Sequence, residues 1–404
     1  MEPRERSLST SSFIRLAMIL FFTEVVRSAF VISFLPAYAA DHLGISVAAV
    51  GLAVSVHYIA DTAVKAVAGY LLDRFAPQAI LHVSLAIAFI GLGMAFFSQQ
   101  PWMLISGAAL IGLGVSPIWL ICLSSIHEGQ RGSQMGTIYT VWLASLGIGP
   151  VAVNFVIDYG YRLTFWVLAV IFAAGWLIAL SWNATLKPIQ TQTLGEQWAQ
   201  LRWKLVAMKP LVPGMILQTA AAGLLVPILP TLARQHLGLS YSQYSLVLIA
   251  GGVVTTLCLI PMGRLSDRWG RKWFLVGGFS ALALGLIGLL LSANHLYATM
   301  LMAALLGGSY AAVLPAWNAL MSYFVPPDQK GMGWGVLSSI EGIGVMVGPL
   351  IGGWVASRYY ASVTVWLSAA MLAFIAFYYL RTPLVRPKEA GEVLERENLG
   401  EGHI

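Results

Sequence analysis

Five ionisable residues lie at helical spacing within two apolar stretches near the start of the chain. Glu24 and Arg27 are three residues apart, and His57, Asp61 and Lys65 follow one another at intervals of four. Residues three or four apart share one face of a helix, so Glu24 can pair with Arg27 and the other three form a titratable stripe. A carboxyl group with little water around it and a cation nearby can bind and release a proton. The spacing therefore predicts proton exchange at Asp61 or Glu24, with Arg27 as the counter-charge.

A structural interpretation of the same charges stays open, because paired charges can simply tie two helices together. Each ionisable group inside a membrane costs about 2.5–3.5 kcal/mol on insertion scales, which makes a functional use the first hypothesis. His57 is a candidate proton relay, although a histidine that is hydrogen-bonded to a neighbouring helix needs no such function. Lys65 lies nearer the cytoplasmic end of its stretch, where a long side chain can reach the membrane surface.

The elements that must position these residues are membrane-spanning helices. Of the 404 residues, 58% are hydrophobic and only 10% are charged, whereas soluble domains have about 25% charged residues. So few charges cannot cover a water-soluble globule, which excludes a cytosolic enzyme, a nucleic-acid-binding protein and a disordered chain. A bilayer core about 30 Å thick needs about 20 apolar residues per helix. About twelve such stretches are present, at residues 13–40, 46–72, 79–98, 101–126, 133–158, 161–184, 210–235, 241–265, 272–293, 296–325, 331–357 and 361–381.

The basic residues predict an orientation for these spans. With both termini in the cytoplasm, 18 of the 23 Lys and Arg residues lie inside and only three lie outside. This bias follows the positive-inside rule and predicts a multi-pass plasma-membrane protein. The expected domains are an N-terminal six-helix bundle at 1–184, a cytoplasmic linker at 185–209, a C-terminal six-helix bundle at 210–381 and a cytoplasmic tail at 382–404.

The chain also repeats itself after 194 to 199 residues. Five motifs recur in the same order: Leu35-Pro36 as Leu229-Pro230, Gly69-x-x-x-Asp73-Arg74 as Gly263-x-x-x-Asp267-Arg268, Pro117-x-Trp119 as Pro315-x-Trp317, Arg131-Gly132 as Lys330-Gly331, and Gly149-Pro150 as Gly348-Pro349. Two bundles of the same topology can expose a central site to each side in turn, which is alternating access. The repeat therefore favours a carrier over a channel or a membrane enzyme.

One second-half loop resembles the cytoplasmic-loop signature of the major facilitator superfamily, in the run Gly263-Arg264-Leu265-Ser266-Asp267-Arg268-Trp269-Gly270-Arg271-Lys272. The resemblance implies an all-α membrane protein with twelve transmembrane helices in two pseudo-symmetric six-helix bundles. It also implies a cytoplasmic latch, in which each Asp is held in one state only. The latch residues are Gly69, Asp73, Arg74, Gly263, Asp267 and Arg268. The first copy has Ala76-Pro77-Gln78 where the family expects Gly-Arg-Arg, so a weaker first-half latch is expected.

Other stretches resemble the proton-coupled glycolipid flippases of lipoteichoic acid biosynthesis in Gram-positive bacteria. They are Val115-Ser116-Pro117-Ile118-Trp119, Leu123-Ser124-Ser125, Val226–Pro230, Leu314–Asn318, Trp334–Gly353, Glu24…Arg27 and His57…Asp61. The resemblance implies a proton antiporter of the bacterial cell membrane that moves a diglucosyl-diacylglycerol lipid from the inner to the outer leaflet. Its expected partners are the glycolipid and protons. It is expected to be a monomer near the enzymes of lipoteichoic acid synthesis, without a cofactor besides the proton gradient.

The uneven distribution of charge suggests how an amphiphile would bind. Apart from basic residues at the ends of the spans, the second half's predicted spans hold only Glu341 as a charged residue, with Gln218 and Asn318 as neutral polar residues. A cavity between the halves would therefore have a polar wall in the first half and an apolar wall in the second. Glu341 does not fit an apolar wall, and it is expected either to be a second proton site or to face the other bundle.

The polar wall supplies the expected headgroup site. Glu24, Arg27 and Asp61 can bind headgroup hydroxyls, while acyl chains follow the apolar helices of the second half. Trp119 and Trp142 match the polar pocket in the resemblance and can stack on sugar rings through their apolar faces. Tryptophan is also common as filler in membrane helices, so this assignment stays open.

Two other functions are compatible with these patterns. A proton-coupled exporter of drugs or small amphiphiles would also place an acid in an apolar cavity, but the one-sided clustering of polar residues favours the glycolipid. A non-transporting sensor or a membrane enzyme belongs to a different class. The sequence has no nucleotide-binding loop, no metal-ligand spacing and no Ser-His-Asp pattern, so neither a metal nor enzymatic activity is expected.

Overall fold

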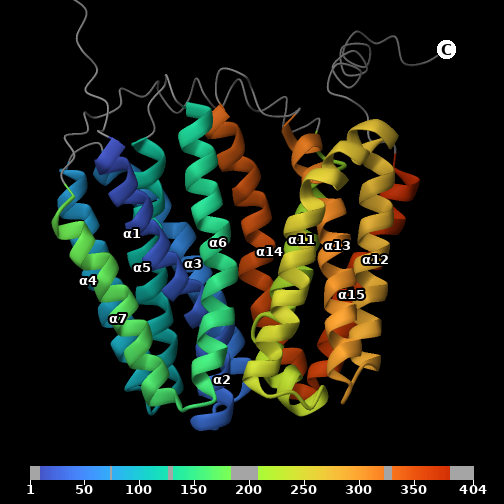
Figure 1. The fold of residues 1–404 in the computed structure, drawn as a ribbon, viewed down its shortest axis with the longest axis horizontal. Coiled ribbons are helices and arrows are strands. Elements are labelled where there is room, and N and C mark those ends of the chain that lie inside the picture. Colours follow the sequence, from blue (N-terminus) through green and yellow to red (C-terminus); the bar gives the residue numbers. More distant parts are fainter. Residues whose placement is uncertain (1–9, 73–74, 126–130, 183–207, 323–329, 383–404) are drawn as a thin grey trace, which may run out of the picture. The chain divides into compact units, whose positions relative to one another are not determined.

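The computed structural model describes residues 10–72, 75–125, 131–182, 208–322 and 330–382, and all regular elements in these ranges are helices (Figure 1). The linker expected at 185–209 and the tail expected at 382–404 lie almost entirely outside the described residues. Asp73 and Arg74 of the expected first-half latch lie outside them as well. The assignment of 1–184 and 210–381 to two separate bundles stays a prediction.

The first half folds into long helices that begin at turn-forming residues. Pro77 and Pro101 open two of them, because a proline in the first turn sacrifices no intrahelical donor. The first span is continuous from Thr10 to His42, with π-helical turns on both sides of Pro36, which has no backbone N–H. The elements are α1 (Thr10–Ala29), η1 (Phe30–Phe34), α2 (Leu35–Ala37), η2 (Tyr38–His42), α3 (Val47–Leu72), α4 (Pro77–Phe96), α5 (Pro101–Ser124), α6 (Arg131–Ile157) and α7 (Tyr161–Leu180).

The second half repeats this order of helices. Its first span is bent by 50° between Val212–Leu225 and Leu229–His236. The break contains Pro227, which removes one backbone donor from the helix. The elements are α9 (Val212–Leu225), α10 (Leu229–Thr231), η4 (Leu232–His236), α11 (Tyr241–Trp269), α12 (Arg271–Leu291), α13 (Leu296–Met321), α14 (Lys330–Arg358) and α15 (Ala361–Arg381).

The helices have the length and hydropathy of membrane spans. In the described ranges, eleven helices meet both criteria, and the bent pair makes up to twelve. The all-α membrane fold and the expected number of spans are therefore confirmed.

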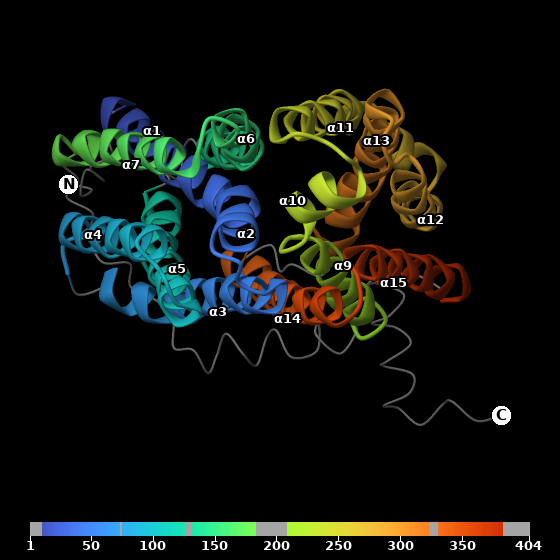
Figure 2. The same ribbon diagram turned by 90° about the horizontal axis from the view of Figure 1, so that it is seen from below.

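Contacts divide the chain into two compact units. Unit 1 comprises Met1–Ile189, Leu224–Leu246 and Pro349–Ala361, and unit 2 comprises Gln190–Gly223, Val247–Gly348 and Ser362–Ile404. Unit 1 thus combines the first-half helices with α10, η4, the first residues of α11 and the last ten residues of α14, and Figure 2 shows α10, α11 and α14 from below.

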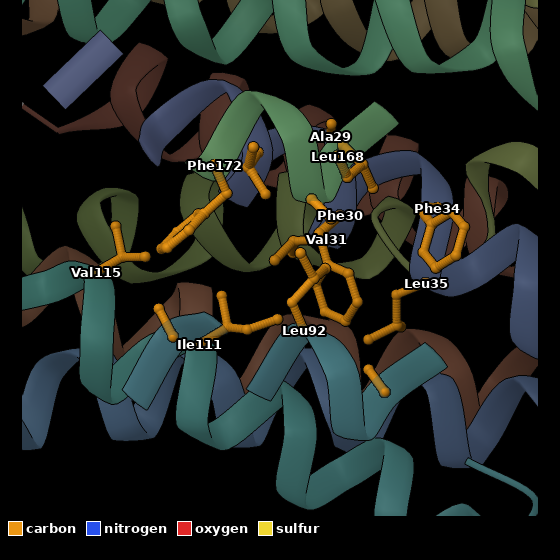
Figure 3. Close-up of a cluster of buried hydrophobic side chains, with 14 of the residues drawn as sticks. Ala29, Phe30, Val31, Phe34, Leu35, Leu92, Ile111, Val115, Leu168 and Phe172 are labelled. Carbon is orange, nitrogen blue, oxygen red and sulfur yellow. The ribbon is translucent and has the colours of Figure 1, made fainter. Parts of the chain in front are cut away.

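Close backbone approach and aromatic packing hold unit 1 together. A Cβ added to Gly91 of α4 would lie 2.7 Å from the carbonyl oxygen of Gly107 in α5, so only glycine allows this distance between the helices. Small residues do the same in membrane proteins generally, because apolar burial does not drive helices together inside lipid. Figure 3 shows the adjoining cluster, in which Phe30, Phe34 and Phe172 are buried with aliphatic side chains of α4 and α5.

One polar contact in unit 1 joins α6 to the start of α11. The Asp158 carboxylate accepts hydrogen bonds from Ser242 N at 2.8 Å, from Ser242 Oγ at 2.6 Å and from Tyr241 N at 3.3 Å. These donors include backbone N–H groups at the helix N-terminus, which have no partner within the helix. Tyr241 also donates its hydroxyl to Asp41 at 2.7 Å, and Asp41 lies 3.6 Å from Arg234 Nε.

Candidate functional site

The first ion pair of the candidate site lies on α1. Glu24 is 3% exposed, and Arg27 donates to its Oε2 from Nε at 2.9 Å and from Nη2 at 2.5 Å. The three-residue spacing places both groups on one face of the helix, as the sequence predicts. The pair satisfies two charges that would each be costly if buried alone.

A second ion pair lies on α3. Lys65 Nζ donates to Asp61 Oδ2 at 2.7 Å, and the Lys65 side chain is 42% exposed whereas that of Asp61 is 14% exposed. Arg27 interacts electrostatically with Asp61 but makes its hydrogen bonds with Glu24. The structure thus gives Asp61 a counter-ion that sequence reasoning had placed at the membrane surface. The signal was present in the four-residue spacing of Asp61 and Lys65.

His57 contacts α5 from the same face of α3. Its Nδ1 hydrogen-bonds the carbonyl oxygen of Ala108 at 3.0 Å, so Nδ1 carries a proton, while Nε2 is buried without a partner among the described residues. Gly112 makes this approach possible, because a Cβ there would clash with the His57 carbonyl oxygen. One ring nitrogen of His57 therefore joins α3 to α5, and its function as a proton relay stays a prediction.

Aromatic side chains of α5 and α6 form a further group in unit 1. The ring centroids of Trp119 and Trp142 are 6.0 Å apart, and Tyr139 meets Trp119 edge-on at 5.3 Å. Both tryptophans are partly exposed, so their faces are not wholly covered by protein. Sequence reasoning missed Tyr139, although it precedes Trp142 by three residues and must share its face.

Electrostatic interactions connect the two ion pairs. Arg27 interacts with Glu24, Asp61 and Tyr58, and Glu24 also interacts with Cys122, one helical turn from Trp119. We call Glu24, Arg27, Tyr58, Asp61 and Lys65 the polar cluster. Within the described ranges, no group of three or more His, Cys, Asp or Glu side chains could hold a metal ion.

The second half has a separate polar group in unit 2. Glu341 Oε1 accepts hydrogen bonds from Trp317 Nε1 at 2.8 Å and from Gln218 Nε2 at 3.2 Å. Thr219 Oγ1 also donates to the backbone carbonyl of Glu341 at 2.7 Å. Asn318, which the sequence pattern grouped with Gln218, is exposed and follows Trp317 on α13.

Unit 2 also contains an apolar groove of about 750 Å³. Helices α11, α12 and α13 line it, mainly with aliphatic, aromatic and glycine residues. The lining includes Val254, Met262, Phe274, Gly277, Leu305 and Gly308. None of the described residues that line it is charged, in contrast to the polar cluster.

The described part of the expected latch lies where α11 meets α12. Asp267 accepts hydrogen bonds from Arg271 at 2.9 and 3.2 Å, and Arg271 also donates to the carbonyl oxygen of Ala319. Gly263 lies against Pro315, with an added Cβ at 3.4 Å. Arg271, which belongs to the same signature run, therefore holds Asp267 in the structure, and the latch function of Arg268 stays a prediction.

The order of spans, the repeat and this loop agree with one known family. The sequence matches the Major Facilitator Superfamily over residues 16–218 and 211–401. The chain belongs to this superfamily. It is therefore a membrane transporter and not an enzyme, as the repeat had suggested.

Curated members of the superfamily are similar along nearly the whole chain. Proton-coupled antiporter flippase LtaA of Staphylococcus saprophyticus is 32% identical over 377 residues, covering 92% of this chain and 94% of the relative. The protein of the same name from Staphylococcus aureus is 32% identical over 373 residues, covering 91% and 94%. The resemblance to the flippases within the major facilitator superfamily is thus confirmed.

A solved structure shows the same superfamily fold. The crystal structure of the nucleoside transporter NupG superposes with a TM-score of 0.73, covering 92% of this chain and 98% of the other. Its sequence is only 16% identical, so this likeness concerns the fold alone.

Proposed function

We propose that this protein is a proton-coupled antiporter that flips a glycolipid from the inner to the outer leaflet by alternating access. The expected substrate resembles diglucosyl-diacylglycerol, the anchor of lipoteichoic acid. The observation that carries the proposal is the polar cluster, in which two paired carboxylates share unit 1 with the partly exposed Trp119 and Trp142. The similarity to relatives named as proton-coupled antiporter flippases supports it.

Proton exchange would use the two ion pairs of the polar cluster. Protonation of Asp61 removes its attraction to Lys65, and protonation of Glu24 does the same for Arg27. An ionised carboxylate can also accept hydrogen bonds from sugar hydroxyls, and protonation weakens this acceptor, so the proton and the headgroup would compete for the same side chain as antiport requires. Proton binding and headgroup binding would thus be linked through the same side chains, with His57 as the relay through Nε2.

Headgroup recognition would use the aromatic cluster as well. The apolar faces of Trp119 and Trp142 suit the C–H faces of sugar rings, and Tyr139 restricts the orientation of Trp119. These residues come from α5 and α6, whereas the ion pairs come from α1 and α3. Four helices would therefore contribute to one headgroup site.

The acyl chains would be accommodated in the apolar groove of unit 2. Its volume of about 750 Å³ and its uncharged lining suit hydrocarbon chains, which need no hydrogen-bond partners. A lipid headgroup and its chains make opposite demands on the protein. The polar cluster of unit 1 suits a sugar headgroup, and the apolar groove of unit 2 suits hydrocarbon chains.

The location follows from the same proposal. The protein would span the bacterial cell membrane with both termini in the cytoplasm, as a monomer near the enzymes of lipoteichoic acid synthesis. Residues 1–184 and 210–381 would form the two bundles that move during alternating access. Glycolipid and protons would be its partners, and the proton gradient its only source of energy.

The decisive experiment measures flipping of a fluorescent diglucosyl-diacylglycerol in proteoliposomes with and without a pH gradient. We expect Asp61→Ala and Arg27→Ala to abolish flipping while both variants keep the wild-type melting temperature within a few degrees. Full flipping in both variants at wild-type protein levels would remove the polar cluster from the mechanism. Efflux of dyes from intact cells together with indifference to the glycolipid would instead identify a drug exporter.

A further inference from the structure

The hydrogen-bonded group around Glu341 has no function in the proposal above. It comprises Gln218 of α9, Trp317 of α13 and Glu341 of α14, all in unit 2. Its members lie 24 to 123 residues apart in the chain, so only the folded bundle brings them together. The group is therefore a feature of the tertiary structure.

The internal repeat shows what this group corresponds to. At the offset of 194 that relates Leu35-Pro36 to Leu229-Pro230, Gln218 is equivalent to Glu24. At 198 Trp317 is equivalent to Trp119, and at 199 Glu341 is equivalent to Trp142. In each half, the first, fourth and fifth spans therefore each carry one of these polar or aromatic residues.

Helix packing confirms that these offsets describe the structure. Gly149 of α6 lies against Val25, Ser28 and Ala29 of α1, where an added Cβ would clash with all three. Gly348 of α14 lies against Ala220 and Gly223 of α9 in the same way. Gly348 is 199 residues after Gly149, and Gly223 is 194 residues after Ala29, so the same pair of helices meets at the same level in both halves.

The two halves differ in the hydrogen-bond partners of their buried or partly buried carboxylates. Glu24 and Asp61 each have a basic partner within hydrogen-bond distance, whereas the donors to Glu341 are a neutral indole and a neutral amide. Among the described residues, no charged side chain interacts with Glu341, and the titratable group that does is Tyr310 of α13. A lone carboxylate is costly in a membrane, and binding a proton removes this cost.

We propose that Glu341 is a second proton-binding site. It lies in the second half of the chain, whereas both ion pairs of the polar cluster lie in the first half. Both donors go to Oε1, so Oε2 can carry the proton while Oε1, as a carbonyl oxygen with two lone pairs, keeps both hydrogen bonds. Trp317 and Gln218 hold the carboxyl group in one orientation in both states. Glu341 is partly exposed, so its carboxyl group is not fully enclosed by the bundle.

This inference rests on the proposed proton coupling but adds a site to it. During transport, Glu341 would take up or release a proton without breaking an ion pair, whereas proton exchange at Asp61 separates it from Lys65. The second half would then take part in coupling directly, although its spans are otherwise apolar.

Infrared difference spectroscopy of the purified protein in lipid nanodiscs tests the site without substrate. On a pH titration, the wild type is expected to show a carboxylic acid C=O band that disappears at high pH, and Glu341→Gln is expected to lack it. Glutamine keeps an acceptor for Trp317 and Gln218, so the fold should survive. Asp61→Asn serves as the matched control, because it should retain the Glu341 band.

A second variant keeps the test valid if Glu341→Gln misfolds. Trp317→Phe removes one donor to Oε1, so the band should remain but move to higher frequency as the C=O bond loses a hydrogen bond. An unchanged spectrum in Glu341→Gln, or no shift in Trp317→Phe, would overturn the proposal. If the wild-type protein showed the Glu341 band but did not flip the glycolipid, the result would count against the proposed function alone.

Discussion

Lys65 and Asp61 lie one turn apart on α3 and share a hydrogen bond of 2.7 Å, so one of the two acids expected to carry the coupling proton has a counter-ion of its own. Arg27 donates two hydrogen bonds to Glu24. The structure therefore has two acid–base pairs on consecutive spans, of which the pair of Glu24 with Arg27 is the one that the spacing predicted.

Replacing Lys65 should uncouple the transporter. Lys65→Met removes the cation from Asp61, which then stays protonated, so flipping driven by a pH gradient should fall by about tenfold or more. Flipping down a glycolipid gradient should fall much less. Both rates can be measured in the same proteoliposomes, and Lys65→Arg should retain coupling because it keeps the charge. Equal loss of both rates in Lys65→Met would argue for a structural function.

Truncation of Trp119 should weaken glycolipid binding more than it weakens folding. Trp119→Ala removes a partly exposed ring that meets Trp142 and Tyr139, and loss of one sugar-stacking face should reduce affinity by about tenfold. Binding can be followed by fluorescence of the labelled lipid, and stability by thermal unfolding. Trp102→Ala on the same helix is the control, since Trp102 is exposed and outside the site. Equal effects of the two variants on affinity would show that Trp119 serves helix packing and not glycolipid binding.

Filling the apolar groove of unit 2 should impair transport without damaging the fold. Gly277 lines the groove, and an added Cβ there meets no atom within 4 Å, so Gly277→Phe has room for its first carbon. We expect a reduction of glycolipid flipping by about fivefold or more through loss of acyl-chain space. Gly252→Phe is a matched control, because Gly252 also has open space but does not line the groove. If both variants flip lipid equally well, the chains bind elsewhere.

Alternating access should require the contact between Asp158 and Ser242 to open. Their side-chain oxygens are 2.6 Å apart in unit 1, so cysteines at both positions should be close enough to form a disulfide under oxidation. The oxidised Asp158→Cys/Ser242→Cys variant should lose nearly all flipping, and reduction should restore it. Each single cysteine variant, treated in the same way, provides the control. Full activity of a verified cross-linked protein would show that this contact persists throughout transport.

Local sequence spacing predicted the contacts that form within one helix. The pairs of Glu24 with Arg27 and of Asp61 with Lys65 follow from helical geometry, which places residues three or four apart side by side. The number of spans follows similarly from hydropathy and bilayer thickness, and the two halves follow from the repeated motifs. These features need no knowledge of how one helix packs on another.

Contacts between helices were decided by the tertiary structure. Nothing in the spacing of Gln218, Trp317 and Glu341 shows that they meet, and the same is true of Asp158 with Ser242 and of His57 with Ala108. The physical reason is that a helix in a membrane is apolar toward both lipid and protein, so its sequence carries little information on which face turns inward. Glycines such as Gly112 and Gly348 help to determine which face of a helix turns inward, because they allow close backbone approach only on one side of the helix.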